Sequence, residues 1–178
     1  MLSIRRFLGL DVPREASPSS DTDTVRRIVS ELEALPPERA RFVAAFAFIL
    51  NRLARADLEI SDVETARMRN IVRDYGDLSE AQAVLVVEIA RTQANVLGAT
   101  EDYLVTREFK RIATPEQRQH LLHCLFEVSA ANDSISVVEE ESIRQIASEL
   151  EFTHPDYITA RSAYSAKRAV LKNLPGGR

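Results

Sequence analysis

The sequence contains a single cysteine, Cys124, among its 178 residues. One thiol cannot form an internal disulfide bond, and it cannot supply a zinc site built from several cysteines. The sequence also lacks any apolar run approaching the ~20 residues that a helix needs to cross a bilayer. Its first ten residues are basic and apolar, but they lack the long apolar core and small-residue cleavage site of a secretory signal. We therefore expect a soluble, cytoplasmic protein.

Neither sign of charge dominates the sequence. The 23 basic and 27 acidic residues leave a net charge of −4, which gives no positive field to attract nucleic acid. The three histidines have no glycine-rich loop or nucleophile elbow beside them, so neither catalysis nor a small-molecule substrate is indicated. Alternation of apolar and polar residues, the mark of a half-buried strand, never persists. These absences argue against a nucleic-acid-binding protein, an enzyme and a β fold.

Apolar residues at helical spacing run through most of the chain. Hydrophobic residues make up 45% of the sequence, which is enough for a core. A broad apolar stripe within residues 38–56 predicts a helix near the centre of that core. The stripe consists of Phe42, Val43, Phe46, Ile49, Leu50 and Leu53. Other helices are expected over residues 24–35, 62–75, 80–97, 101–112, 115–128, 137–150 and from 154 onward. The predicted fold class is all-α, with one domain of about seven to eight helices.

The two ends of the chain differ in composition from the middle. Residues 1–23 are predicted to form a flexible N-terminal segment and linker, residues 24–172 the helical domain, and residues 173–178 a disordered tail. Within the first segment, Met1–Leu10 has an amphipathic pattern. That pattern suits either a frayed or docked terminus or a contact with a membrane surface or protein partner.

Capping boxes mark the expected helix starts. In such a box a serine or threonine accepts from the backbone of the third helical residue, whose own side chain reaches back. The boxes begin at Ser61, Ser79, Thr114, Ser136 and Thr153. The last of them contains His154-Pro155-Asp156, the tripeptide of J-domain co-chaperones, which we interpret here as a helix start. A zinc site at His120, His123 and Cys124 lacks further ligands, so a partly buried cysteine beside solvated histidines is the preferred interpretation.

Two stretches of the sequence match each other without gaps. The helix pair from Glu38 to Tyr75 aligns with the pair from Pro115 to Leu150. The matched positions around the turns are Asp57 with Asn132, Ile60 with Ile135, Ser61 with Ser136 and Glu64 with Glu139. This repeat predicts two helical hairpins related by a pseudo-twofold axis, with the two inter-helix turns facing each other.

Oxygen-bearing side chains gather at both turns. They are Asp57, Glu59 and Glu64 at the first turn, and Asn132, Asp133, Glu139 and Glu140 at the second. Hard divalent cations such as Ca²⁺, Mg²⁺ or Mn²⁺ bind several oxygen ligands at one point, so these residues form a candidate metal site. The turns are not EF-hands, because Leu53 and Arg55 stand where the first and third ligands belong. Helix capping and complementation of the helix dipole remain the alternative role for these acids.

The stretch Leu53–Ser61 with Glu64, repeated as Ser129–Ser136 with Glu139, resembles the tellurite-resistance family TerB. The likeness covers Pro37–Tyr164. A TerB-like domain also begins certain membrane-associated co-chaperones of the DnaJ type. The resemblance implies an all-helical domain with internal pseudo-symmetry and an acidic patch proposed to bind divalent metal. It also implies a stress-response role, often beside membrane or chaperone partners.

The sequence departs from the usual family pattern at these turns, where Ala-Asp-Gly is common. Leu58 and Asp133 replace the glycine, and Asn132 replaces the second aspartate.

Two hypotheses for the function follow from the sequence. The first is a non-enzymatic TerB-like domain that binds a divalent cation at the acidic turns. The second is an interaction module that contacts a protein or a membrane surface without metal.

Overall fold

The computed structural model describes residues 20–54, 62–92, 99–131 and 134–168. Within these ranges the chain forms one all-α domain of eight helices, followed by a short 3₁₀ helix, and contains no strand. The helices are α2 (Ser20–Glu33), α3 (Pro37–Ala54), α4 (Asp62–Gly76), α5 (Glu80–Thr92), α6 (Ala99–Ile112), α7 (Pro115–Ala130), α8 (Val137–Glu149) and α9 (His154–Ser162), and the 3₁₀ helix is η1 (Ser165–Lys167). The predicted fold class is confirmed.

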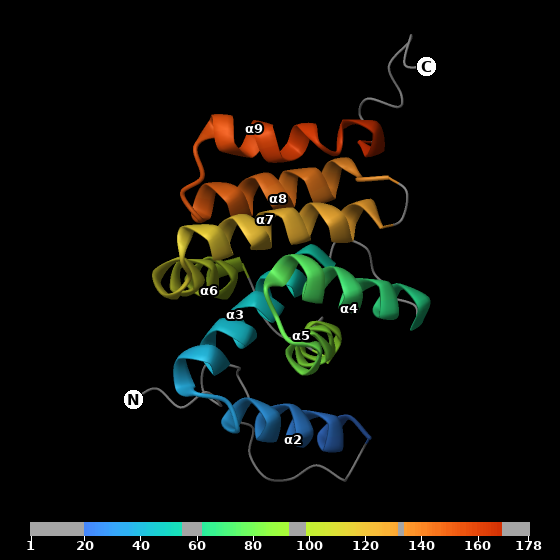
Figure 1. The fold of residues 1–178 in the computed structure, drawn as a ribbon, viewed down its shortest axis with the longest axis vertical. Coiled ribbons are helices and arrows are strands. Elements are labelled where there is room, and N and C mark those ends of the chain that lie inside the picture. Colours follow the sequence, from blue (N-terminus) through green and yellow to red (C-terminus); the bar gives the residue numbers. More distant parts are fainter. Residues whose placement is uncertain (1–19, 55–61, 93–98, 132–133, 169–178) are drawn as a thin grey trace.

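The helices are stacked along the long axis of the molecule. In Figure 1, α9, α8 and α7 lie beside one another at the top, and α2 lies at the opposite end. Helix α3 crosses the middle and packs on α5 and α6. No helix in the described part of the chain is both long and apolar enough to cross a membrane.

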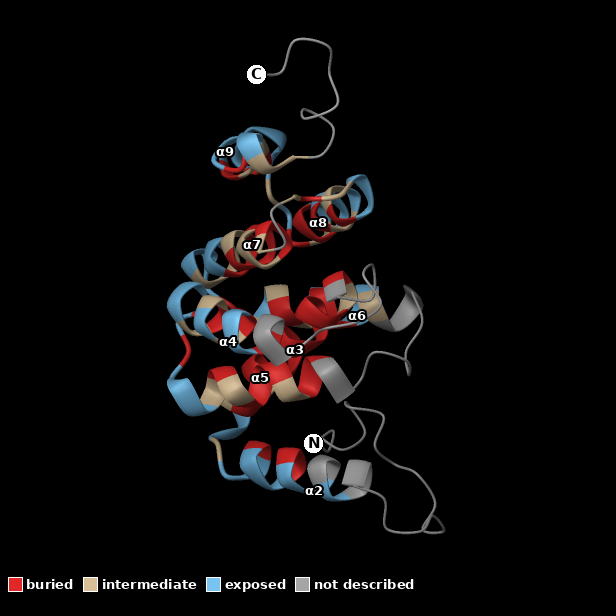
Figure 2. Ribbon diagram, turned by 90° about the vertical axis from the view of Figure 1, so that its right-hand side faces the viewer, coloured by how far each residue is buried: buried red, intermediate tan, exposed pale blue. Residues whose placement is uncertain are grey.

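Helix α3 forms the centre of the core, as Figure 2 shows by its burial. Every residue from Phe42 to Leu50 is buried, and Leu53 is buried as well. The rings of Phe42 and Phe46 pack against Phe109 of α6, with centroids 5.2 and 6.1 Å away. The apolar stripe predicted from the sequence is therefore the inner surface of the domain.

The two predicted hairpins pack crosswise. Helix α4 packs on α7, and α3 packs on α8, so the first helix of each hairpin contacts the second helix of the other. A pseudo-twofold relation between the hairpins, as predicted from the repeat, would place the helices in this way. The largely buried guanidinium of Arg52 on α3, whose side chain is 10% exposed, also binds Glu149 on α8, with Nη1–Oε2 and Nη2–Oε1 distances of 2.7 and 3.0 Å. This bidentate ion pair fixes the end of α8 against α3.

Most of the predicted helix starts are confirmed. Thr114, Ser136 and Thr153 each accept a hydrogen bond from the third helical residue, and each box is closed by the returning side chain. The Ser79 box is present as well. The tripeptide at His154 is thus the start of α9, with Thr153 as its cap. Ser61 lies outside the described residues.

Two helix boundaries differ from the prediction by more than a residue or two. Helix α2 begins at Ser20 instead of Thr24 and so extends into the predicted linker. Helix α9 ends at Ser162, well before the position expected from its apolar pattern. The chain turns there because the ring of Tyr164 stacks on Phe126 of α7, with centroids 5.1 Å apart. Most of the predicted N-terminal segment (1–19 of 1–23) lies outside the described residues, and so do the predicted tail (173–178) and the expected end of α5 at residue 97.

Candidate functional site at the second acidic turn

The seven predicted ligands fall mostly outside the described side chains. Asp57, Glu59, Asn132 and Asp133 lie in undescribed turns, and the side chain of Glu64 at the start of α4 is undescribed too. Glu139 and Glu140, in the first turn of α8, are the two described members. The convergence of the two turns therefore stays a prediction. Of the candidate metal site, only the two residues on α8 can be described.

Glu139 is a buried carboxylate with one engaged oxygen. Its residue is 7% exposed. Its backbone N–H donates to Ser136 Oγ at 3.2 Å, and its Oε2 accepts from the Ser136 N–H at 2.8 Å. Its Oε1 accepts no hydrogen bond from a described residue, and it does not belong to the buried unpartnered polar atoms, so solvent reaches this oxygen. Capping therefore orients this carboxylate and leaves one of its oxygens for another ligand.

Glu140, the next residue, has both oxygens in ion pairs. Its Oε1 accepts from Arg168 Nη2 at 2.6 Å and from Arg161 Nη1 at 3.1 Å, and its Oε2 accepts from Arg168 Nε at 2.8 Å. Burial by itself raises the pKa of Glu140, but the hydrogen bonds and charges of Arg168 and Arg161 hold that pKa below its usual range. Glu140 is therefore ionised, and its charge is balanced by arginine.

A short segment after α9, which we call the C-terminal strap (residues 164–168), holds both sides of the second turn. On the α8 side, the Ile135 N–H donates to the Lys167 carbonyl at 2.8 Å, and Ile135 and Arg168 form an isolated parallel bridge. On the α7 side, the Tyr164 hydroxyl donates to Glu127 Oε1 at 3.0 Å. The strap thus fixes the end of α7 and the start of α8 relative to each other.

The helices that precede the two turns each carry a buried polar oxygen without a partner in the described structure. They are Oδ1 of Asn51 in α3 and Oγ of Ser129 in α7. Both residues lie in the last turn of their helix. A buried polar atom normally has a hydrogen bond, an ordered water or an ion as its partner. Amide and hydroxyl oxygens are also ligands that hard cations accept.

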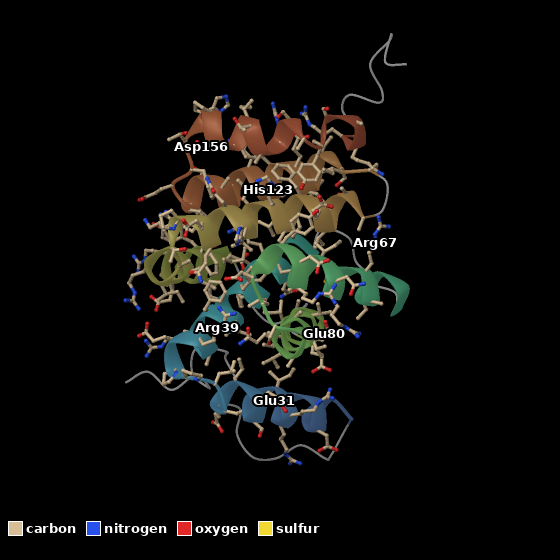
Figure 3. All side chains as sticks on the ribbon, in the orientation of Figure 1. Glu31, Arg39, Arg67, Glu80, His123 and Asp156 are labelled. Carbon is tan, nitrogen blue, oxygen red and sulfur yellow. The ribbon has the colours of Figure 1, made fainter. Side chains whose placement is uncertain are left out.

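The histidines and the cysteine form no metal site in the described part of the chain. His123, labelled in Figure 3, and exposed His120 lie on α7 beside Cys124, which is fully buried. Burial raises the pKa of the Cys124 thiol well above its usual range, and the charge of Glu127 acts in the same direction. No cluster of three or more histidine, cysteine or acidic residues suited to a metal occurs among the described residues. Cys124 is a core residue, more deeply buried than the partly buried position expected from the sequence.

Sequence reasoning missed the arginines and the strap. Arg161 and Arg168 lie 21 and 28 positions after Glu140, with no local spacing that links them to it. The apolar pattern of the last helix instead suggested a continuous helix through this region. One signal in the sequence was Tyr164, an aromatic residue suited to burial. It lies two residues after the end of α9 and stacks on Phe126 of α7.

A comparison with known protein families matches the part of the chain that contains both helical hairpins. The family model of TerB, described as tellurite resistance protein TerB, matches residues 42–162. This span runs from within α3 to the end of α9 and includes both hairpins, while α2 and the C-terminal strap lie outside it. No curated protein and no solved structure matches the chain. Because the match covers well over half of the sequence, the chain belongs to the TerB family.

Proposed function

We propose that this chain is a non-enzymatic stress-response domain of the tellurite-resistance type that binds a divalent cation, Ca²⁺, Mg²⁺ or Mn²⁺, at its acidic turns. The observation that carries the cation proposal is the state of Glu139. This carboxylate is 7% exposed, is oriented by the Ser136 cap, and has an oxygen that no described residue engages. A cation would complete the coordination of that oxygen.

The neighbouring oxygens support the same proposal. Asp57, Glu59 and Glu64 in the first turn and Asn132 and Asp133 in the second would supply the remaining ligands. Each is an oxygen donor, which suits hard cations and argues against zinc or copper. Glu140 suits a direct ligand less well than Glu139, because two arginines occupy its oxygens.

Calorimetric titration of the full chain with Ca²⁺, Mg²⁺ and Mn²⁺ tests the proposal. We expect saturable binding of at least one cation, weakened about tenfold or more in Glu139→Gln and in Asp57→Ala, an effect at least as large as losing an outer-shell partner. Glu116→Gln is the matched control, because Glu116 is an exposed acid in the first turn of α7. The absence of saturable heat, or equal affinity in Glu139→Gln and the wild type, would refute the cation proposal.

A second candidate function is an interaction surface without metal. Val137 and Val138, adjacent at the start of α8, are 60% and 61% exposed. Two neighbouring exposed valines beside buried Glu139 are suited to contact with an apolar partner surface. The same titration separates the two functions, because an interaction surface alone predicts no saturable cation binding.

A further inference from the structure

Four of the five large hydrophobic side chains that the described part of the chain exposes occur as two adjacent pairs. Tyr103 and Leu104 on α6 are 51% and 46% exposed, and Val137 and Val138 on α8 are 60% and 61% exposed. Exposed apolar side chains scattered singly are usual on a protein surface, whereas apolar side chains gathered together mark contact sites. The two pairs are therefore candidate contact surfaces.

The α6 pair belongs to a basic surface. We call this surface the α6 patch, and its four exposed residues, which helical spacing puts on one side of α6, are Tyr103, Leu104, Arg107 and Arg111. Arg111 pairs with Glu108 at 2.8 Å, whereas Arg107 forms no ion pair with a described residue. The hydrogen bond and charge of Arg111 lower the pKa of Glu108, against the effect of its partial burial. The charges of Arg41, on α3, and Arg107 act on this carboxylate in the same direction. Even with Glu38, whose charge acts on Arg111, these three arginines outnumber the two acids.

The α8 pair belongs to a surface of the opposite charge, which we call the α8 patch (Val137, Val138 and Glu141). Glu141 lies one helical turn after the valines, and its side chain is 59% exposed. Its ion pair in the described structure is with Arg144 of the same helix, whose side chain is equally exposed. An exposed pair of this kind contributes little to stability, so Glu141 is able to exchange Arg144 for another partner.

The two patches match in spacing and are opposite in charge. In each, two adjacent apolar residues are followed by a charged residue three positions after the second, from Leu104 to Arg107 and from Val138 to Glu141. Contact between the patches would join apolar side chains to apolar side chains and a cation to an anion. An anionic lipid surface would suit the α6 patch, but it would repel Glu141 and leave the valines uncovered. A second copy of the chain covers both patches.

We propose that the α6 patch of one copy of this chain docks on the α8 patch of a second copy. The patches lie at opposite ends of α8, because Val137 begins this helix and the α6 patch lies near its end. At that end Arg52 bridges Glu149 of α8 and Asp102 of α6, with N–O distances of 2.7 and 3.9 Å, and Asp102 directly precedes Tyr103. Two copies with their α8 helices antiparallel therefore make the contact twice about a twofold axis, which gives a closed dimer. This inference rests on the second candidate function, the interaction surface, and needs no bound cation.

The test measures the mass of the full chain by analytical ultracentrifugation over a range of concentrations, in EDTA. We expect the wild type to change with concentration from the 20.0 kDa of one copy towards twice that mass. Glu141→Arg and Arg107→Glu each place like charges in both contacts of the dimer, and each should weaken self-association about tenfold or more. An equal mixture of the two variants should associate more tightly than either alone. In the mixed pair one contact regains opposite charges and the other contact is that of the wild type.

The matched controls are Glu31→Arg and Arg67→Glu, which make the same changes of charge at exposed positions on α2 and α4 (Figure 3). Both should associate like the wild type, and circular dichroism establishes that every variant is folded. A wild type that stays at 20.0 kDa at every concentration would overturn the proposal. So would a mixture that associates no better than its two components. Because EDTA removes divalent cations, these outcomes are independent of the cation titration, and either proposal can fail alone.

Discussion

Glu139 and Glu140 have the same side chain and adjacent positions, but their surroundings differ. The role of Glu139 could be predicted, because a capping box places its carboxylate three residues after a serine. The role of Glu140 could not, because its partners come from α9 and the C-terminal strap. Local spacing predicts contacts within one turn of a helix. It carries no information on contacts that depend on where a later segment docks.

Tyr164 provides a prediction at the residue scale, on the dependence of stability on pH. Burial, and then the hydrogen bond and charge of Glu127, raise the pKa of Tyr164 above its usual range. Above pH ~10 the unfolded chain therefore loses this proton before the folded chain does, so the free energy of unfolding falls as pH rises. We expect Tyr164→Phe to show a shallower fall between pH ~9.5 and ~11.5, measured by urea unfolding at several pH values.

The control for this prediction is Tyr103→Phe, which alters a tyrosine that is 51% exposed on α6. It should retain the alkaline fall of the wild type. At neutral pH, Tyr164→Phe should lose about 1 kcal/mol, because a hydrogen bond to a carboxylate is removed. A Tyr164→Phe variant with the alkaline slope of the wild type would show that this hydroxyl does not retain its proton more strongly in the folded state.

At the scale of single elements, helix starts could be predicted more accurately than helix ends. Starts depend on local hydrogen bonds, such as those of the Thr114 and Ser136 boxes. Ends depend on tertiary packing, as the early end of α9 shows. Helix α4 ends at Gly76, one residue after its predicted range, and Asp77 after it has a positive φ of 53°. The glycine serves another purpose, since a Cβ on Gly76 would lie 3.0 Å from Phe46 Cζ.

Gly76→Ala tests this packing role of the α4 terminus. Alanine is favoured over glycine in a helix by roughly 1 kcal/mol, so an unobstructed site would be stabilised. Here the added methyl group has to displace the Phe46 ring in a closely packed core, at a cost of about 1–3 kcal/mol. We expect a net destabilisation of about 1 kcal/mol by urea unfolding. In a Phe46→Leu background the same substitution should cost less, and an unchanged cost there would contradict the proposed contact.

At the scale of the whole molecule, the all-α class and the central position of α3 could be predicted because burial leaves a periodic pattern in the sequence. The internal repeat predicted two hairpins related by a pseudo-twofold axis, and the packing of α4 on α7 and of α3 on α8 is compatible with that prediction. The closing of the second turn by the C-terminal strap could not be predicted. It arises from a backbone hydrogen bond between Ile135 and Lys167, and such bonds have no side-chain signature.

The location of a bound cation is the most direct test of the account. In a titration of the isotope-labelled chain with Mn²⁺, the paramagnetic ion broadens the amide resonances of nearby residues. We predict that broadening at low Mn²⁺ concentration centres on the first turn of α8 and on the first acidic turn, and that it disappears from both in Glu139→Gln. Broadening scattered over exposed acids such as Asp74 and Glu141, and unchanged in Glu139→Gln, would contradict a cation site at the acidic turns.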